Sequence, residues 1–265
     1  MTTPSSTGLD LQSAADELGV HYQTAYRWVR SGRLPAVRVA GRYLIDRCVL
    51  DEFTASRSQP QPTSAPSVAR VQRTADRLYD ELVDGDEPAV RRAVRRLVDD
   101  GAPLPGVIEQ VLAPALRRIG EEWHRGELSI WVEHRASAIV ERVLGDVTPN
   151  PRGRRRGTAV VTAVSGELHS LPTTMAAVAL RGDQWQVHHL GADLPTDDLI
   201  RCCADHDVDL VVITVTNPEL RADSDVAAEL VRSAGWPVLV GGPGRTLTEL
   251  VDEARAVGAR PTGSR

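Results

Sequence analysis

The feature that most constrains the fold is a regular alternation of short apolar runs and amphipathic segments over residues 158–258. The apolar runs are five to seven residues long and rich in β-branched side chains, as at 158–164 and 210–214. Runs of this length between amphipathic helices are typical of parallel strands that are buried on both faces. The pattern therefore predicts a doubly wound parallel α/β sheet of the flavodoxin or Rossmann type.

The ends of these expected strands carry the candidates for a ligand site. The expected strands are 158–164, 186–190, 210–214 and 237–240, and the expected helices are 171–181, 195–206, 222–233 and 247–257. In such sheets, ligands bind beyond the carboxyl ends of the strands. His169 lies in the first loop at this edge, and Gly241 and Gly242 lie in a later one. A single loop histidine is usually an ordinary surface residue, so the sheet alone indicates no particular ligand.

Two polar, turn-prone segments divide the chain. Residues 57–67 hold three prolines among Gln, Ser and Thr without an apolar period, which is the composition of a linker. Residues 149–157 separate a purely helical stretch from the alternating one. We therefore expect three domains, at 9–56, 68–148 and 158–258.

The middle domain has the pattern of a four-helix bundle. Apolar residues recur at steps of three and four over 68–84, 87–100, 105–125 and 129–147. Ionisable and aromatic residues gather where the third expected helix ends and the fourth begins; they are Trp123, His124, Trp131, Glu133 and His134. Each of them alone is equally well explained by core packing or by a solvated helix start.

The first domain has the pattern of a DNA-binding module. Two short helices that end near Gly19 and Gly32 precede a run around Gly41 that alternates as a hairpin or wing would. All 31 basic residues of the chain are arginine and the net charge is −5, so only the placement of arginine is informative. Residues 21–47 hold six arginines and one acid, whereas residues 1–20 hold three acids and no arginine. This bias predicts phosphate contact; the alternative is a solvated arginine face on a protein-binding helical domain.

Residues 21–45 closely resemble the excisionase and MerR type of winged helix-turn-helix domain. The resemblance implies that the second helix enters the major groove of double-stranded promoter DNA and that the wing contacts its backbone or minor groove. The expected base contacts are Gln23, Thr24 and Arg27, and the expected phosphate contacts are Arg30, Arg38 and Arg42. Domains of this kind act in pairs or larger assemblies, so we expect a homo-oligomer, either a dimer or a tetramer.

The spacing from Trp123 to Glu133 and His134 resembles the W-x9-E-H pattern of light-sensing, adenosylcobalamin-dependent repressors of the CarH type. In that family the bundle covers the upper face of the corrin. The resemblance implies that Trp123 forms an apolar wall and that Glu133 accepts a hydrogen bond from the ribose or adenine. It implies that His134 lines the same pocket. His124 would be the upper cobalt ligand after loss of the adenosyl group.

The loop Glu167-Leu168-His169-Ser170-Leu171-Pro172 resembles the Asp/Glu-x-His-x-x-Gly loop of cobalamin-binding domains in methionine synthase, mutases and photoreceptor repressors. The resemblance implies that His169 is the lower cobalt ligand and that Glu167 sets its tautomer and basicity. The other residues expected to bind the cofactor and its displaced nucleotide tail are Ser170, Thr214, Thr216, Gly241 and Gly242. Pro172 replaces the glycine of the motif, and a first-turn proline is sterically acceptable there.

The function that these patterns favour is a transcriptional regulator, a repressor rather than an enzyme, that senses light through adenosylcobalamin. Photolysis would change the oligomeric state and the affinity for DNA. One alternative is a regulator without cobalamin or with another tetrapyrrole, which Pro172 motivates. Another is a cobalamin-carrying methyltransferase subunit, although the length leaves no room for a substrate domain.

The chain has the composition of a cytoplasmic protein. It has no secretory signal and no apolar run long enough to span a membrane. Its three cysteines, Cys48, Cys202 and Cys203, have no metal-ligand spacing, and adjacent cysteines rarely form a disulfide with each other. We therefore expect a reduced protein.

Overall fold

The computed structural model describes residues 8–20, 22–30, 32–39, 41–58, 68–147, 150–151, 153 and 155–258. Most of the expected linker, and the side chain of the predicted base contact Arg27, lie outside the described part of the chain. The chain forms two compact units, one built around the N-terminal domain and one that contains the bundle and the parallel sheet.

The N-terminal unit is a small winged helix-turn-helix domain. Its elements are β1 (Gly8–Asp10), α1 (Leu11–Glu17), α2 (Tyr22–Arg30), β2 (Val37–Val39), β3 (Arg42–Asp46) and α3 (Arg47–Ser58). The carboxylate of Asp10 accepts a hydrogen bond from the backbone N–H of Ser13 at 2.7 Å and so caps α1. Trp28 of α2 and Leu34 are buried in the core of this unit. Strand β1 pairs with β3 and was not predicted, because three residues are too few to show alternation.

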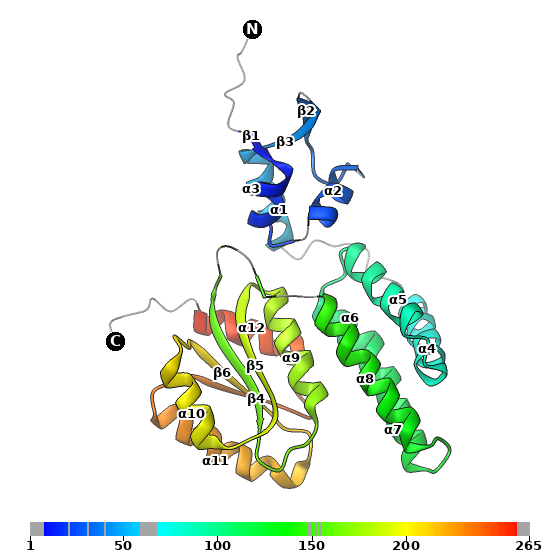
Figure 1. Ribbon diagram of the computed structural model, residues 1–265, viewed down its shortest axis with the longest axis vertical. Coiled ribbons are helices and arrows are strands. Elements are labelled where there is room, and N and C mark those ends of the chain that lie inside the picture. The colour runs from blue at the N-terminus through cyan, green and yellow to red at the C-terminus, as the bar shows by residue number, and fades with distance from the viewer. Residues whose placement is uncertain are drawn as a thin grey trace. The chain divides into compact units, whose positions relative to one another are not determined.

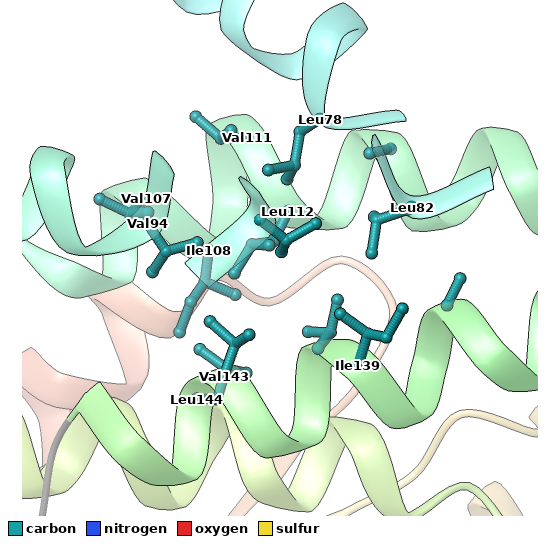
Figure 2. Close-up of a cluster of buried hydrophobic side chains, with 14 of the residues drawn as sticks. Leu78, Leu82, Val94, Val107, Ile108, Val111, Leu112, Ile139, Val143 and Leu144 are labelled. Atoms are coloured by element: carbon teal, nitrogen blue, oxygen red, sulfur yellow. The ribbon is translucent and has the colours of Figure 1, made fainter. Parts of the chain in front are cut away.

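The bundle has the four helical segments that the periodicity predicts, but the third is interrupted. Its elements are α4 (Val68–Asp84), α5 (Glu87–Asp99), α6 (Leu104–Val107), η1 (Ile108–Leu112), α7 (Ala113–His124) and α8 (Ile130–Val147). Segment η1 is a π-helical turn in which the N–H of Ala113 bonds the carbonyl of Ile108, five residues back. Pro114 has no N–H to donate to the preceding turn, which accounts for the interruption. Leu112 and Ile139 meet in the buried core between these helices (Figure 2).

The second layer of this unit is a four-stranded parallel sheet with helices on both faces, which confirms the predicted fold class (Figure 1). The strands are β4 (Gly157–Val164), β5 (Trp185–Leu194), β6 (Leu210–Thr214) and β7 (Val238–Gly241), in the order β5-β4-β6-β7. The helices are α9 (Ser170–Gly182), α10 (Thr196–Asp205), η2 (Pro218–Leu220), α11 (Arg221–Ser233) and α12 (Leu247–Gly258). Leu210 and Val212 of β6 pack on the face covered by α9 and α12, whereas Val211 and Ile213 pack on the face covered by α10 and α11.

The bundle and the sheet layer are joined by shared packing and by two polar contacts. Val178 of α9 belongs to the bundle core, and α9 lies between the sheet and α8 (Figure 1). The hydroxyl of Ser170 donates to the carboxylate of Glu141 on α8 at 2.5 Å. Glu109 in the π turn accepts bonds from the backbone N–H (3.0 Å) and hydroxyl (3.2 Å) of Thr248 in the first turn of α12. In the described part of the chain, no helix is both long and apolar enough to cross a membrane.

Candidate functional site

The loop after β4 holds a histidine and a buried carboxylate in direct contact. The side chain of Glu167 is only 1% exposed, and its Oε1 lies 2.5 Å from Nδ1 of His169. The other oxygen, Oε2, accepts from the backbone N–H groups of Thr216 at 2.7 Å and Asn217 at 2.8 Å. Glu167 therefore joins the loop after β4 to the loop after β6 at the carboxyl ends of two adjacent strands.

These hydrogen bonds keep Glu167 ionised and fix the tautomer of His169. Burial raises the pKa of Glu167, but the hydrogen bonds from Asn217, Thr216 and His169 outweigh it and lower that pKa to about 2. An ionised carboxylate can only accept hydrogen bonds, so Nδ1 of His169 carries the proton. The Nε2 lone pair is then available to a metal, and the imidazole is 61% exposed.

The carboxyl ends of β6 and β7 form a cradle of small residues beside this loop. The hydroxyl of Thr214 is buried and, among the described residues, has no hydrogen-bond partner. A Cβ at Gly242 would lie 2.6 Å from the backbone carbonyl oxygen of Val215, and the φ of Gly242 is +152°. The Thr214 hydroxyl is thus a buried polar group that a ligand tail could satisfy, whereas Gly242 has to be glycine because the Val215 carbonyl fills the space where a Cβ would stand.

Proline 172 fits the start of helix α9. The helix begins at Ser170, so Pro172 is its third residue and its missing N–H has no partner to lose. The hydroxyl of Thr173 donates to the carbonyl of Ser170 at 2.5 Å and so ties the same turn together. The loop of the motif therefore forms with proline in place of glycine.

Trp123 and His124 end helix α7 and are both exposed. The Trp123 side chain is 39% exposed, although it is a large apolar group. The ring of His124 lies edge-on to the Trp123 ring with centroids 5.8 Å apart. An exposed tryptophan beside an exposed histidine forms a surface that a flat ligand could cover.

Glu133 and His134 open helix α8 and contact each other. Nδ1 of His134 lies 2.6 Å from one carboxylate oxygen of Glu133, and the hydroxyl of Ser137 donates to the other at 2.9 Å. Glu133, Ser137 and Glu141 follow at four-residue steps on one face of α8. Glu141 accepts a hydrogen bond from Ser170, next to His169. This face of α8 therefore connects the residues expected above the corrin, through Glu133, with the loop of His169. Within the described residues, no direct hydrogen bond or ion pair joins Trp123, His124, Glu133 or His134 to His169.

The structure describes two of the three predicted base contacts on α2, Gln23 and Thr24, and the predicted phosphate contact Arg30. Gln23 and Arg30 are exposed, whereas Thr24 is half-buried. Ala25 and Trp28 on the opposite face are buried in the core. Among the described side chains, Gln23 and Arg30 therefore lie on the face of α2 opposite to its buried residues.

The wing is linked to α2 by a chain of aromatic rings that the sequence analysis did not single out. Arg38 and Arg42 are exposed, and the guanidinium of Arg38 lies 5.8 Å from the ring centroid of Tyr43. The Tyr43 ring contacts Tyr26 of α2 edge-on at 6.0 Å, and Tyr26 stacks on Tyr22 at 6.3 Å. These rings link Tyr43, and Arg38 beside it, to α2.

Sequence reasoning missed three further residues that hold the loop of His169. Asn217 supplies a backbone N–H to Glu167, and Glu141 supplies the acceptor for Ser170. Asp193 accepts from the N–H of Gly166 at 2.8 Å and donates its own N–H to the carbonyl of Glu167 at 3.0 Å, with a φ of +57°. The sequence shows none of these pairings, because the partners are separated by about 26 to 50 residues.

Three segments of the chain match known domain families. Residues 9–58 match the helix-turn-helix domain. Residues 74–146 and 157–259 match two families that are both described as B12 binding domain. The matched segments contain the predicted DNA-binding residues, the loop of His169 and the four residues expected at the upper face of the corrin, which are Trp123, His124, Glu133 and His134.

The chain is also similar to two repressors and to a corrinoid protein. The HTH-type transcriptional repressor CarH of Myxococcus xanthus is 30% identical over 176 residues, which are 65% of this chain and 58% of that protein. The repressor CarA of the same organism is 27% identical over 231 residues, 83% of this chain and 74% of that protein. The match to CarH thus spans less than two thirds of its length.

The structure of the Methanosarcina barkeri monomethylamine corrinoid protein covers 70% of this chain and 99% of that chain, with a TM-score of 0.55 and 15% identity. This likeness shows that the bundle and sheet share a fold with a corrinoid protein. The helix-turn-helix domain, the two B12-binding families and the identity to CarH and CarA together confirm the predicted resemblance. The chain therefore resembles the CarH type of regulators, and it combines a helix-turn-helix domain with a B12-binding domain made of a helical bundle and a parallel sheet.

Proposed function

We propose that this chain is a DNA-binding transcriptional repressor, not an enzyme, that senses light through adenosylcobalamin. The observation that carries the proposal is the Glu167–His169 pair, which leaves an imidazole nitrogen free at the strand ends. It occurs in a chain that also holds a helix-turn-helix domain. Bound adenosylcobalamin would supply a cobalt–carbon bond that visible light cleaves.

The residues of the sheet layer fit the lower part of such a ligand. Nε2 of His169 would bind cobalt, and Glu167 holds the proton on Nδ1, which orients the ring. The Thr214 hydroxyl, which has no partner among the described residues, would bond the nucleotide tail, and Gly241, where a Cβ would meet nothing nearer than 3.9 Å, would leave room for that tail. The N–H groups of Thr216 and Asn217 remain committed to Glu167.

The residues of the bundle fit the upper part. Trp123 would pack against the adenosyl group, and Glu133 would accept a hydrogen bond from its ribose or base. After loss of the adenosyl group, Trp123 would lose that packing partner and His124 would be the residue that could ligate cobalt. A switch requires that the two states differ in their free energy of assembly or of DNA binding.

The test is to load the protein with adenosylcobalamin in the dark and to record its visible spectrum, its size and its binding to promoter DNA before and after illumination. We expect retained corrin absorbance, and light-dependent changes in the spectrum, the oligomeric state and DNA affinity. His169→Ala should lose the corrin, whereas His124→Ala should bind it in the dark but give a different spectrum after light. His206→Ala, a histidine on the far side of the sheet, is the matched control.

Each alternative has its own outcome in the same experiment. A loaded sample without any light response would refute light sensing and leave a cobalamin-binding regulator. No retained corrin would favour a regulator with another ligand or none. Transfer of a methyl group from a donor to added cob(I)alamin would instead favour a carrier subunit of a methyltransferase.

A further inference from the structure

A cavity of about 350 Å³ lies between helices α4 and α5, outside every residue that the proposed cobalamin site uses. The two helices run side by side and are joined by a tight turn at Gly85 (Figure 1). A cavity of this size is at the lower end of the range for small-molecule sites, which start at roughly 300 Å³. It therefore has room for a ligand of mononucleotide size.

The lining of this cavity is rich in arginine. Arg73 from α4 and Arg92 and Arg96 from α5 contribute guanidinium groups, and in the described part of the chain none of these three forms an ion pair. Arg77 also lines the cavity, but it is paired with Glu81 at 3.0 Å. The lining holds four arginines and two acids, Glu81 and Asp100, so its net charge is positive; the planar forks of the three arginines without an ion pair suit phosphate oxygens.

Two further features indicate more than a simple anion. One carboxylate oxygen of Glu81, Oε2, is buried in the wall and has no hydrogen-bond partner among the described residues. A rotation of the Glu81 carboxylate toward the cavity would bring this oxygen within reach of an N–H or O–H donor on a ligand. Ala93 and Leu97 supply an apolar wall. Asp100 also lines the cavity, so a pure polyanion without a donor is less well matched than a mixed ligand.

We propose that the α4–α5 cavity binds a nucleoside phosphate. Its phosphate would contact Arg73, Arg92 and Arg96, and its base or ribose would pack against Leu97. A ribose hydroxyl or base N–H would satisfy Glu81. This site does not depend on cobalamin, and it gives the bundle a second ligand through which a metabolic signal could act on the same chain.

The test is calorimetric titration of the full-length protein with ADP, GDP, inorganic phosphate and adenosine. We expect ADP or GDP to bind about tenfold or more tightly than phosphate or adenosine, a difference of ~1.4 kcal/mol. Arg92→Gln and Arg96→Gln should each weaken nucleotide binding by about tenfold. Arg95→Gln, on the same helix but outside the cavity, is the matched control and should bind like the unmodified protein. Glu81→Gln should weaken nucleotide binding and leave phosphate binding unchanged.

Several outcomes would overturn the proposal. They are no saturable binding at millimolar concentration, equal affinity for phosphate and ADP, and binding that survives both arginine changes. The same conclusion follows if His169→Ala abolishes ADP binding, because the nucleotide would then occupy the corrin site. If the arginine variants weaken DNA binding while no nucleotide binds, the arginines belong to a DNA-contacting surface instead. Circular dichroism of each variant separates these outcomes from misfolding.

Discussion

The two adjacent glycines at the end of β7 offer a direct test of the cradle. Gly241→Ala and Gly242→Ala add the same methyl group one residue apart. At Gly242 the new Cβ would lie 2.6 Å from the carbonyl oxygen of Val215, and the backbone has a φ of +152°. At Gly241 it would lie 3.9 Å from the Thr214 methyl and 4.0 Å from a carbonyl oxygen, which is ordinary contact.

The structure therefore predicts different costs for the two changes. A left-handed backbone that is nearly restricted to glycine costs about 1–3 kcal/mol with any other residue. The overlap at Gly242 involves backbone, which cannot rotate away, and overpacking of this kind adds about 1–3 kcal/mol. Gly242→Ala should thus lower the free energy of unfolding by ~2–6 kcal/mol. Gly241→Ala should change it by less than about 1 kcal/mol, because the methyl fits and alanine reduces the entropy of the unfolded chain.

The two variants should also separate stability from binding. Urea unfolding of the cofactor-free protein, followed by circular dichroism, should show a midpoint lower by about 1–3 M for Gly242→Ala, given a slope of ~2 kcal/mol/M. Gly241→Ala should unfold like the unmodified protein but bind cobalamin about tenfold more weakly, since its methyl group would lie next to the Thr214 side chain, whose hydroxyl we expect to bind the nucleotide tail. Equal destabilisation by both changes would refute the steric reasoning. Normal cobalamin binding by Gly241→Ala would refute the proposal that the nucleotide tail lies at the carboxyl ends of β6 and β7.

Four further changes test the other parts of the chain. Leu112→Ala in the fully buried bundle core should cost about 2–5 kcal/mol in urea unfolding. Asp10→Ala removes the cap of α1 and should cost about 0.5–2 kcal/mol at pH 7. The backbone hydrogen bond from Ser13 lowers the pKa of Asp10. The contribution of Asp10 to the free energy of unfolding is therefore fully present above the pKa of the unfolded chain and is lost as the pH falls through the lowered pKa of the folded protein. Thermal melts of the variant and the unmodified protein at pH 7 and pH 3 check this. Glu141→Ala removes the acceptor of Ser170 and should weaken cobalamin binding about tenfold, with the melting temperature of the cofactor-free protein nearly unchanged. Arg38→Ala should weaken DNA binding uniformly across sequences and reduce the salt slope by about 1.

The fold was predictable where the local pattern and the final packing agree. The helix 68–84 and the strand 210–214 occur with the bounds that their periodicity predicts. The third bundle helix was expected to be continuous through Pro114, and it contains a π turn instead. The local effect of Pro114 depends on which group donates to the carbonyl that its missing N–H leaves unbonded. That donor is a property of the folded bundle and not of a residue pattern.

Only the contacts within a single loop of the site were predictable from the sequence. Glu167 and His169 are two residues apart, so one loop brings them together whatever the rest of the chain does. The anchors at Asp193 and Asn217 come from other strand ends, and their roles follow from the strand order β5-β4-β6-β7. A single sequence gives the presence of a parallel sheet far better than its strand order, so these contacts had no earlier signal.

Helix α8 explains how residues of two different layers can serve one ligand. Its buried face, which includes Val140 and Leu144, packs in the bundle core. The neighbouring face carries Glu133, Ser137 and Glu141 at four-residue steps, all half-buried. Eight residues of helix span ~12 Å, so Glu133 lies about that far along the axis from the residue that holds the loop of His169. Helix α9 packs against α8 and begins at that loop. A change in the packing of the first turn of α8 would therefore act on the helix that also holds the loop of His169, the proposed lower ligand of cobalt. In the proposed function, α8 would therefore connect Glu133, above the corrin, with Glu141, which holds the loop of His169 below it.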